Sequence, residues 1–242
     1  MESQPSRLRL IKELLRLGRN GELRMDDLIL ATRADEECLD TTIKAFEDGG
    51  FLHRLGDRIL LDREGKIRLL VMGCELGGDV EELGRLIGWM DFEILIQKAL
   101  EAYGYKVIHA FRFSHGKRRW EVDLLALRNP FILCIDCKHM LRRQGSSLKR
   151  GAEHNNARAK SLGESLESLE EKLSINSWKR ALILPIIVSL LAPPFQEYKG
   201  CPIVPILKLR NFLSELGGYI DSFRTLSFER DAQGMWRGEN LP

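Results

Sequence analysis

Hydrophobic positions in the first sixty residues recur at helical spacing and then alternate as they do in strands. The spacing predicts helices over residues 6–18 and 25–31. A third helix is expected to begin at Asp35, a residue type that caps helices, and to end at Gly49. Residues 51–61 follow as two short strands joined by a turn. The chain therefore opens with a small module of three helices and a hairpin.

This order of elements over residues 1–62 resembles a winged helix-turn-helix module, which often binds DNA through its third helix. Here the third helix exposes, beside Lys44, five carboxylates: Glu36, Glu37, Asp40, Glu47 and Asp48. Such a surface repels phosphates, so contact with a protein partner or a scaffold role is favoured over base reading. Arg54 and Arg58 in the hairpin leave DNA binding by this module open.

The rest of the chain changes in pattern. Residues 63–87 are expected to form a helical linker, and residues 88–242 a second domain. The second domain is predicted to contain, in order, a helix at 89–103, strands at 105–113, 120–127 and 131–138, a long helix at 149–173, strands at 180–191 and 202–207, and a helix at 212–219. Strands interspersed with helices indicate an α/β fold with a mixed central sheet flanked by helices.

Composition and charge narrow the class of protein. Of the 242 residues, 44% are hydrophobic and 30% charged, which suits a folded core and excludes global disorder. The net charge is +2, but residues 106–160 hold 13 basic and 4 acidic residues, a net of +9, which predicts a phosphate-binding surface there. The longest apolar run, 15 residues, is shorter than the about 20 that span a bilayer. Five scattered cysteines and the lack of an export signal indicate a reducing, cytoplasmic location.

Charged residues stand at the ends of two apolar strands of the second domain. Alternation along the first strand places Asp123 on one face with Leu125, and Val122 on the other. Asp136 and Lys138, two residues apart, share a face at the end of the next strand. A short turn pairs these strands antiparallel, so Asp123 is expected to converge with Asp136 and Lys138 on one face. Two carboxylates and a lysine so placed suggest a hard divalent cation.

Asp123 followed by Asp136-Cys137-Lys138 resembles the motif of PD-(D/E)xK nucleases. The preceding helix, with Phe92-Glu93 and then Gly104 to Val107, is similar to the Mrr-type and archaeal Holliday-junction-resolvase branch. The likeness covers about residues 88–190. It implies a restriction-endonuclease-like fold and a metal-dependent endonuclease acting on DNA, with branched or structured DNA in repair, recombination or defence as expected substrates.

The resemblance also implies a role for each residue of the motif. Asp123 and Asp136 would bind Mg²⁺ or Mn²⁺ with the backbone carbonyl of Cys137, and Lys138 would orient and help to deprotonate the attacking water. Glu93 would complete the site, through a metal-bound water or by positioning Lys138. Relatives of this kind often act as homodimers. Asp136 is shorter than the more frequent glutamate, so a catalytically silent binding module and a winged-helix transcription regulator remain alternatives.

Basic residues bracket the predicted site in the sequence. The set expected to contact the nucleic-acid backbone comprises Arg112, Lys117, Arg118, Arg119, Arg142, Arg143, Lys149 and Arg150. An ordinary solvated face is the alternative for these residues. Trp120 is expected in the core and His154 on a helix face without a catalytic role. Cys134 and Cys137 face opposite sides of a strand, which argues against a shared zinc ion.

Overall fold

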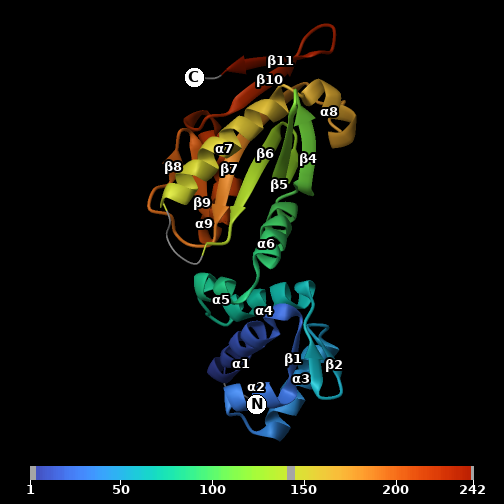
Figure 1. Ribbon diagram of the computed structural model, residues 1–242, viewed down its shortest axis with the longest axis vertical. Coiled ribbons are helices and arrows are strands. Elements are labelled where there is room, and N and C mark those ends of the chain that lie inside the picture. Colours follow the sequence, from blue (N-terminus) through green and yellow to red (C-terminus); the bar gives the residue numbers. More distant parts are fainter. Residues whose placement is uncertain (1–3, 141–144, 241–242) are drawn as a thin grey trace. The chain divides into compact units, whose positions relative to one another are not determined.

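The computed structural model describes residues 4–140 and 145–240 (Figure 1). The chain divides into two compact units, Met1–Leu95 and Ile96–Pro242. Each unit has its own sheet. Within the described residues, no helix combines the length and the apolar character that crossing a membrane requires.

The first unit packs helices against a small antiparallel sheet of order β1-β3-β2. Its elements are α1 (Gln4–Leu17), the 3-10 helix η1 (Gly18–Asn20), β1 (Glu22–Arg24), α2 (Met25–Thr32), α3 (Glu36–Asp48), β2 (His53–Leu55), β3 (Arg58–Leu60), α4 (Arg63–Glu75) and α5 (Val80–Leu86). Asp35 caps α3 as predicted, because its side chain accepts hydrogen bonds from the backbone N–H groups of Glu37 and Cys38. Strand β1 was not predicted from the sequence.

The segment expected as a linker is packed into the first unit. Helix α4 contacts α1 and buries Leu69 and Leu70 completely or nearly so. Lys66 of the same helix is 5% exposed and lies 3.6 Å from the carboxylate of Asp91. Asp91 also accepts a hydrogen bond from the backbone N–H of Gly88 at 3.2 Å. Its carboxylate therefore stabilises the N-terminal end of the next helix.

The second unit is built on an eight-stranded mixed sheet of order β11-β10-β7-β6-β5-β4, with β9 beside β7 and β8 beside β9. Helix α6 (Trp89–Ala102) crosses the border between the units. The elements that follow are β4 (Lys106–His115), β5 (Arg118–Arg128), β6 (Phe131–Lys138), α7 (Gly145–Gly163), α8 (Leu166–Leu173), β7 (Arg180–Ser189), β8 (Glu197–Tyr198), β9 (Cys201–Pro205), α9 (Ile206–Tyr219), η2 (Ile220–Ser222), β10 (Leu226–Arg230) and β11 (Trp236–Asn240).

The sheet is mixed because β5 pairs antiparallel with β4 and β6, whereas β6 pairs parallel with β7. Helices α7 and α8 lie between the two parallel strands in the chain, and α7 lies across the sheet in Figure 1 and contacts β6 and β7. Helix α9 contacts β7 and β9. These features confirm the predicted α/β class, a mixed sheet flanked by helices and preceded by a helical region.

Four details of the predicted second domain differ from the structure. The long helix predicted at 149–173 is two helices, α7 and α8, separated after Gly163. A Cβ at Gly163 would lie 2.2 Å from the ring of Phe228, so the close packing of β10 requires glycine there. Helix α9 begins at Ile206, six residues earlier than predicted, and the β10–β11 hairpin was not predicted. Helix α7 also begins at Gly145, four residues earlier than the predicted start at 149.

Candidate active site

The alternation of side chains along β5 reverses next to Asp123, and the predicted face assignment is therefore wrong. Val122 and Leu125, three residues apart, both belong to the core cluster that includes residues of α7 and α8. Regular alternation would place them on opposite faces. On β4, Ala110 adopts a left-handed φ of 48°, and the register on either side of it places it across from Asp123. Asp123 consequently points away from α7.

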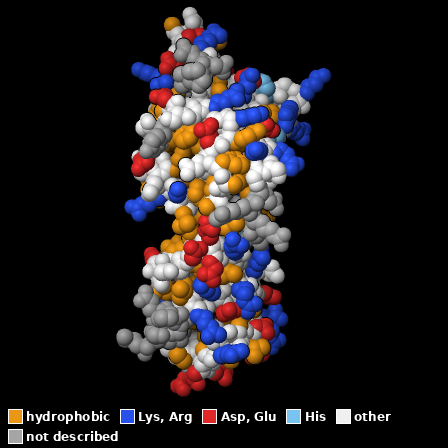
Figure 2. All heavy atoms as spheres, turned by 90° about the vertical axis from the view of Figure 1, so that its left-hand side faces the viewer, with side chains coloured by type: hydrophobic (Ala, Val, Ile, Leu, Met, Phe, Trp, Pro, Cys, Tyr) orange, Lys and Arg blue, Asp and Glu red, His pale blue; other side chains and the backbone are white. Residues whose placement is uncertain are grey.

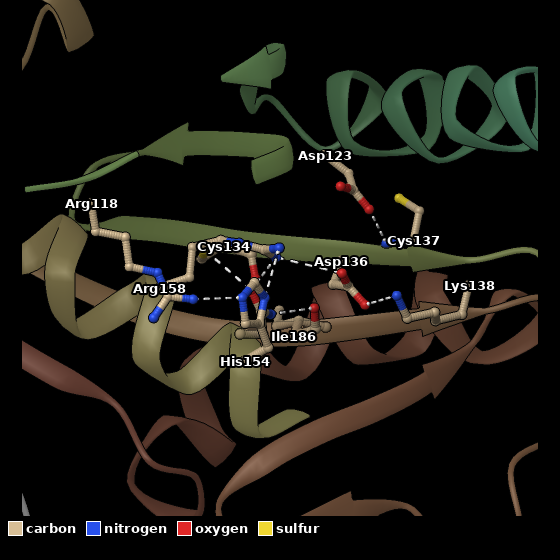
Figure 3. A network of polar contacts seen from close by, with 10 residues as sticks. Arg118, Asp123, Cys134, Asp136, Cys137, Lys138, His154, Arg158 and Ile186 are labelled. Atoms are coloured by element: carbon tan, nitrogen blue, oxygen red, sulfur yellow. Dashed lines mark hydrogen bonds and ion pairs between the residues drawn. The ribbon is translucent and has the colours of Figure 1, made fainter. Parts of the chain in front are cut away.

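Asp123 makes its contact at the end of β6. Its Oδ2 accepts a hydrogen bond from the backbone N–H of Cys137 at 2.8 Å. Figure 3 shows this carboxylate and the sulfur of Cys137 on the same side of β6, and the ligand atoms of the two side chains lie within 4.8 Å of one another. Burial raises the pKa of Asp123, and the nearby carboxylate of Asp136 raises it further, against the opposing effect of the Cys137 N–H.

Asp136 and Lys138 point to the other side of β6, towards α7 (Figure 3). The Nζ of Lys138 lies 2.6 Å from Oδ2 of Asp136, and Nη1 of Arg158 lies 3.5 Å from Oδ1. Asp136 is 6% exposed, so two cations compensate one buried carboxylate. The structure thus separates Asp123 from the Asp136–Lys138 pair by the width of β6, instead of gathering all three on one face as predicted.

Two buried polar residues of α7, Asn155 and Arg158, complete this network and were missed as site residues. The side-chain amide of Asn155 donates to the carbonyls of Cys134 at 2.8 Å and Ile186 at 3.0 Å, and so joins β6 to β7. Its Oδ1 accepts from Nη1 of Arg158 at 3.1 Å. The available signal was their position between Ala152 and Ala159, on the apolar face of the helix.

His154 lies between two arginines (Figure 3). Its Nε2 is 3.0 Å from Nη2 of Arg118, and its Nδ1 is 3.3 Å from Nη2 of Arg158. Burial lowers the pKa of His154, and both guanidinium groups lower it further. The guanidinium of Arg118 stacks 3.7 Å above the ring of Trp120, which is buried in the core as predicted.

Glu93, the predicted fourth site residue, lies on α6 and is 3% exposed. It belongs to the first unit, and the same helix continues from Ile96 into the second. Its participation in the site stays a prediction. Cys134 and Cys137 lie on opposite sides of β6, as the sequence indicated, and burial raises the pKa of the Cys134 thiol to about 12. Because their thiols lie on opposite sides of the strand, these two cysteines cannot bind the same metal ion.

Most of the predicted phosphate-binding residues lie on the β4–β5 hairpin and the beginning of α7. Lys117, Arg118 and Arg119 are exposed at the hairpin, and Arg112 pairs with Glu121 at 2.6 Å. On α7, Arg150 is exposed, and Lys149 lies 5.5 Å from the centre of the Tyr198 ring. Arg142 and Arg143 lie outside the described residues. Figure 2 shows basic side chains gathered along one margin of the second unit.

The donors around Asp123 suit a divalent cation. Its carboxylate is partly buried beside a second carboxylate, where an added positive charge stabilises the ionised form. Oxygen and sulfur donors from Asp123 and Cys137 lie close enough to contact one ion. Asp136, in contrast, already has two cationic partners. Asp123 is thus the stronger candidate for holding a metal.

The family comparison supports a nuclease-like superfamily that is related to the PD-(D/E)xK enzymes. Residues 89–188 match the family model of NERD, the nuclease-related domain. An uncharacterized protein of Archaeoglobus fulgidus is 31% identical over 137 residues, which cover 56% of this chain and 96% of that protein. The chain therefore belongs to the same family as this archaeal protein, and its residues 89–188 form a nuclease-related domain.

Two solved structures resemble the chain more distantly. The crystal structure of protein VC1899 from Vibrio cholerae has a TM-score of 0.40 and 14% identity, and the match covers 90% of this chain. The crystal structure of AF1548, a protein of unknown function, has a TM-score of 0.34 and 16% identity and covers 52% of this chain. The chain spans 51% of the first of these proteins and 65% of the second.

Proposed function

We propose that residues 88–242 form a metal-dependent endonuclease that hydrolyses phosphodiester bonds in DNA. The observation that carries the proposal is the end of β6, where Asp123 lies on one side and the Asp136–Lys138 pair on the other. Phosphodiester hydrolysis requires a nucleophile at neutral pH and positive charge near the phosphorus. These residues supply carboxylate ligands for a metal and a lysine, and the charges of Asp136 and Lys138 both act on Asp123.

In this proposal, Asp123 and the backbone carbonyl of Cys137 hold Mg²⁺ or Mn²⁺. Residues of a strand direct their N–H and C=O groups to the same side, and the N–H of Cys137 already points at Asp123. The bound ion would supply an activated water and neutralise developing negative charge. Asp136 is the second proposed ligand, and Glu93 completes the site through water or by positioning Lys138.

In this proposal, the ammonium of Lys138 moves away from Asp136 and contacts the phosphate of the substrate. Its side chain is 26% exposed, whereas that of Asp136 is 8% exposed, so the ammonium has a path towards solvent. There it orients the water and stabilises the charge that develops on the phosphate oxygens. The exposed basic residues of the β4–β5 hairpin and of α7 bind the DNA backbone without reading sequence.

The wider assignment is also part of the proposal. Residues 1–62 act as a winged-helix-like module that contacts a protein partner through the acidic surface of α3, residues 63–87 pack against this module and lead on from it, and residues 88–242 form the nuclease domain. A homodimer would supply two sites for two strands, and the substrate is branched or structured DNA, as in the Mrr-type and Holliday-junction-resolvase branch.

The test is a cleavage assay on linear duplex, flap, four-way junction and single-stranded DNA, with Mg²⁺, Mn²⁺ or EDTA. Wild type is compared with Asp123→Ala, Lys138→Ala and Asp48→Asn, an exposed position of α3 that serves as the control. Cleavage that requires metal, is lost in the first two variants and persists in the third supports the proposal. Cleavage that survives Asp123→Ala and Lys138→Ala refutes the assignment of the site.

A second candidate function is binding of nucleic acid without cleavage. The observation that favours it is the compensation of Asp136 by Lys138 and Arg158, which leaves that carboxylate stable without a metal. Under this alternative, the wild-type protein slows the migration of DNA in a gel at low salt and cleaves none of the four substrates. Binding would then weaken steeply as salt rises, because phosphate contacts dominate it.

A further inference from the structure

Helix α7 buries a charged residue in the face that it packs against the sheet. Its neighbours on this face are apolar or small, including Leu148, Ala152, Ala159 and Leu162, each at most 1% exposed. Arg158 is 7% exposed. A buried guanidinium loses most of its hydration, so it requires a fixed and favourable set of partners.

The head of Arg158 is held in place by the strands beneath it. Nη1 donates to Oδ1 of Asn155, and Asn155 is itself fixed by the carbonyls of Cys134 and Ile186. Figure 3 shows this chain of contacts running from α7 into β6 and β7. Because Asn155 is fully buried and bound to both strands, its Oδ1 is a fixed acceptor, and Arg158 cannot turn away without losing this buried hydrogen bond.

Asp136 therefore has one fixed and one releasable cation. Lys138 lies 2.6 Å from Oδ2, on a flexible stem whose side chain is 26% exposed. Arg158 lies 3.5 Å from Oδ1, with a side chain that is 9% exposed. Removing every cation from a buried carboxylate is strongly unfavourable, but removing one of two is far less so.

We propose that Arg158 is a positioning residue that acts as the permanent counter-ion of Asp136 and thereby releases Lys138 for the phosphate of the substrate. This inference rests on the proposed function of the same site. Without Arg158, Lys138 becomes the remaining side-chain cation beside a buried carboxylate, and the ammonium stays bound to Asp136. The lysine then no longer reaches the phosphate.

The kinetic expectation concerns Arg158→Gln, which keeps a polar group for Asn155 and removes the charge. The kcat for DNA cleavage should fall about 10- to 100-fold, with KM changed less than about threefold, because DNA binding depends on the exposed basic residues instead. Arg158→Lys should recover part of the loss, since it restores a cation. Equal losses in Arg158→Gln and Arg158→Lys, matched by equal losses of thermal stability, would show a packing role and overturn the inference.

A second measurement does not depend on cleavage. Reductive methylation of lysines, followed by mass spectrometry, reports how often the Lys138 amine leaves its carboxylate. Methylation of Lys138 should slow several-fold in Arg158→Gln, and this difference should vanish in an Asp136→Asn background. Lys199, which pairs with Glu153 at the surface, provides the internal control in the same digest.

The two measurements separate the two claims. If wild type cleaves DNA and Lys138 is methylated at the same rate with and without Arg158, the inference is wrong and the proposed function stands. If no substrate is cleaved but Arg158→Gln slows methylation only when Asp136 is present, the counter-ion role is supported and the proposed function fails.

Discussion

A single methyl group added at Gly151 should test whether the position of Lys138 matters more than the stability of the domain. Gly151 lies in α7, directly over the Asp136–Lys138 pair. A Cβ there would lie 3.2 Å from Cε of Lys138, 3.3 Å from Cδ1 of Ile187 and 3.4 Å from Oδ2 of Asp136. These contacts are tight but short of a hard clash, and the nearest atom belongs to a flexible side chain.

The expected magnitudes follow from these distances. Replacing glycine by alanine inside a helix stabilises it by about 1 kcal/mol. The crowding offsets part of this gain, so Gly151→Ala should change the free energy of unfolding by about 0 to +1 kcal/mol. Lys138 must move by roughly 0.3 Å, and since a misplacement of 1 Å costs about 100-fold, the cleavage rate should fall about fourfold.

The assay pairs urea unfolding with the rate of DNA cleavage, both on the full chain. Gly217→Ala in α9 is the matched control, because nothing lies within 4 Å of the added methyl group. The control should gain about 0.5–1 kcal/mol and keep its cleavage rate. Two results would refute the reasoning: an unchanged cleavage rate in Gly151→Ala, or a loss of more than about 2 kcal/mol, which would show rigid overpacking.

Three further substitutions probe the same region. Asn155→Leu removes two buried hydrogen bonds to strand carbonyls and should destabilise the protein by about 3 kcal/mol, measured by urea unfolding. Asp123→Asn should stabilise the protein at neutral pH. Because the pKa of Asp123 is raised in the folded state, the wild-type protein loses stability as pH rises through that pKa. The stability that Asp123→Asn gains over wild type should therefore disappear in acid, and thermal melts across pH test this. His154 has a lowered pKa, so its protonation opposes folding as pH falls through about 6.5; His154→Gln should flatten that part of the stability profile, and an unchanged profile would contradict the assignment.

Local sequence was sufficient where one residue determines one feature. Asp35 caps α3, Gly49 follows the end of that helix, and the apolar run from Phe131 forms a strand in the middle of the sheet. In each case the side chain itself supplies the cap, the stop or the buried surface. The β10–β11 hairpin escaped prediction because its strand pattern is weak and its formation depends on pairing with β7.

The candidate site divides in the same way. The sequence identified three site residues, Asp123, Asp136 and Lys138. Burying charged side chains at the ends of apolar strands is unfavourable unless they are paired or bound to a metal. The prediction of the side of the sheet to which Asp123 points was wrong. The reversal of side-chain alternation next to Asp123 involves a left-handed φ at Ala110, and no glycine in the sequence marks that position. Arg158 and Asn155 were missed as site residues because a helix pattern does not show which polar side chains the sheet covers.

The central position of β6 in the sheet has a consequence for the local and global opening of the domain. This strand has neighbours on both sides, and Asn155 of α7 binds its backbone from above. Amide hydrogens in such a position exchange with solvent mainly when the whole domain opens, unlike those of edge strands and loops. Asp136 and Lys138, two of the residues proposed for catalysis, therefore lie on the strand whose amides are expected to exchange most slowly. Their geometry should persist through local fluctuations and be lost together with the fold.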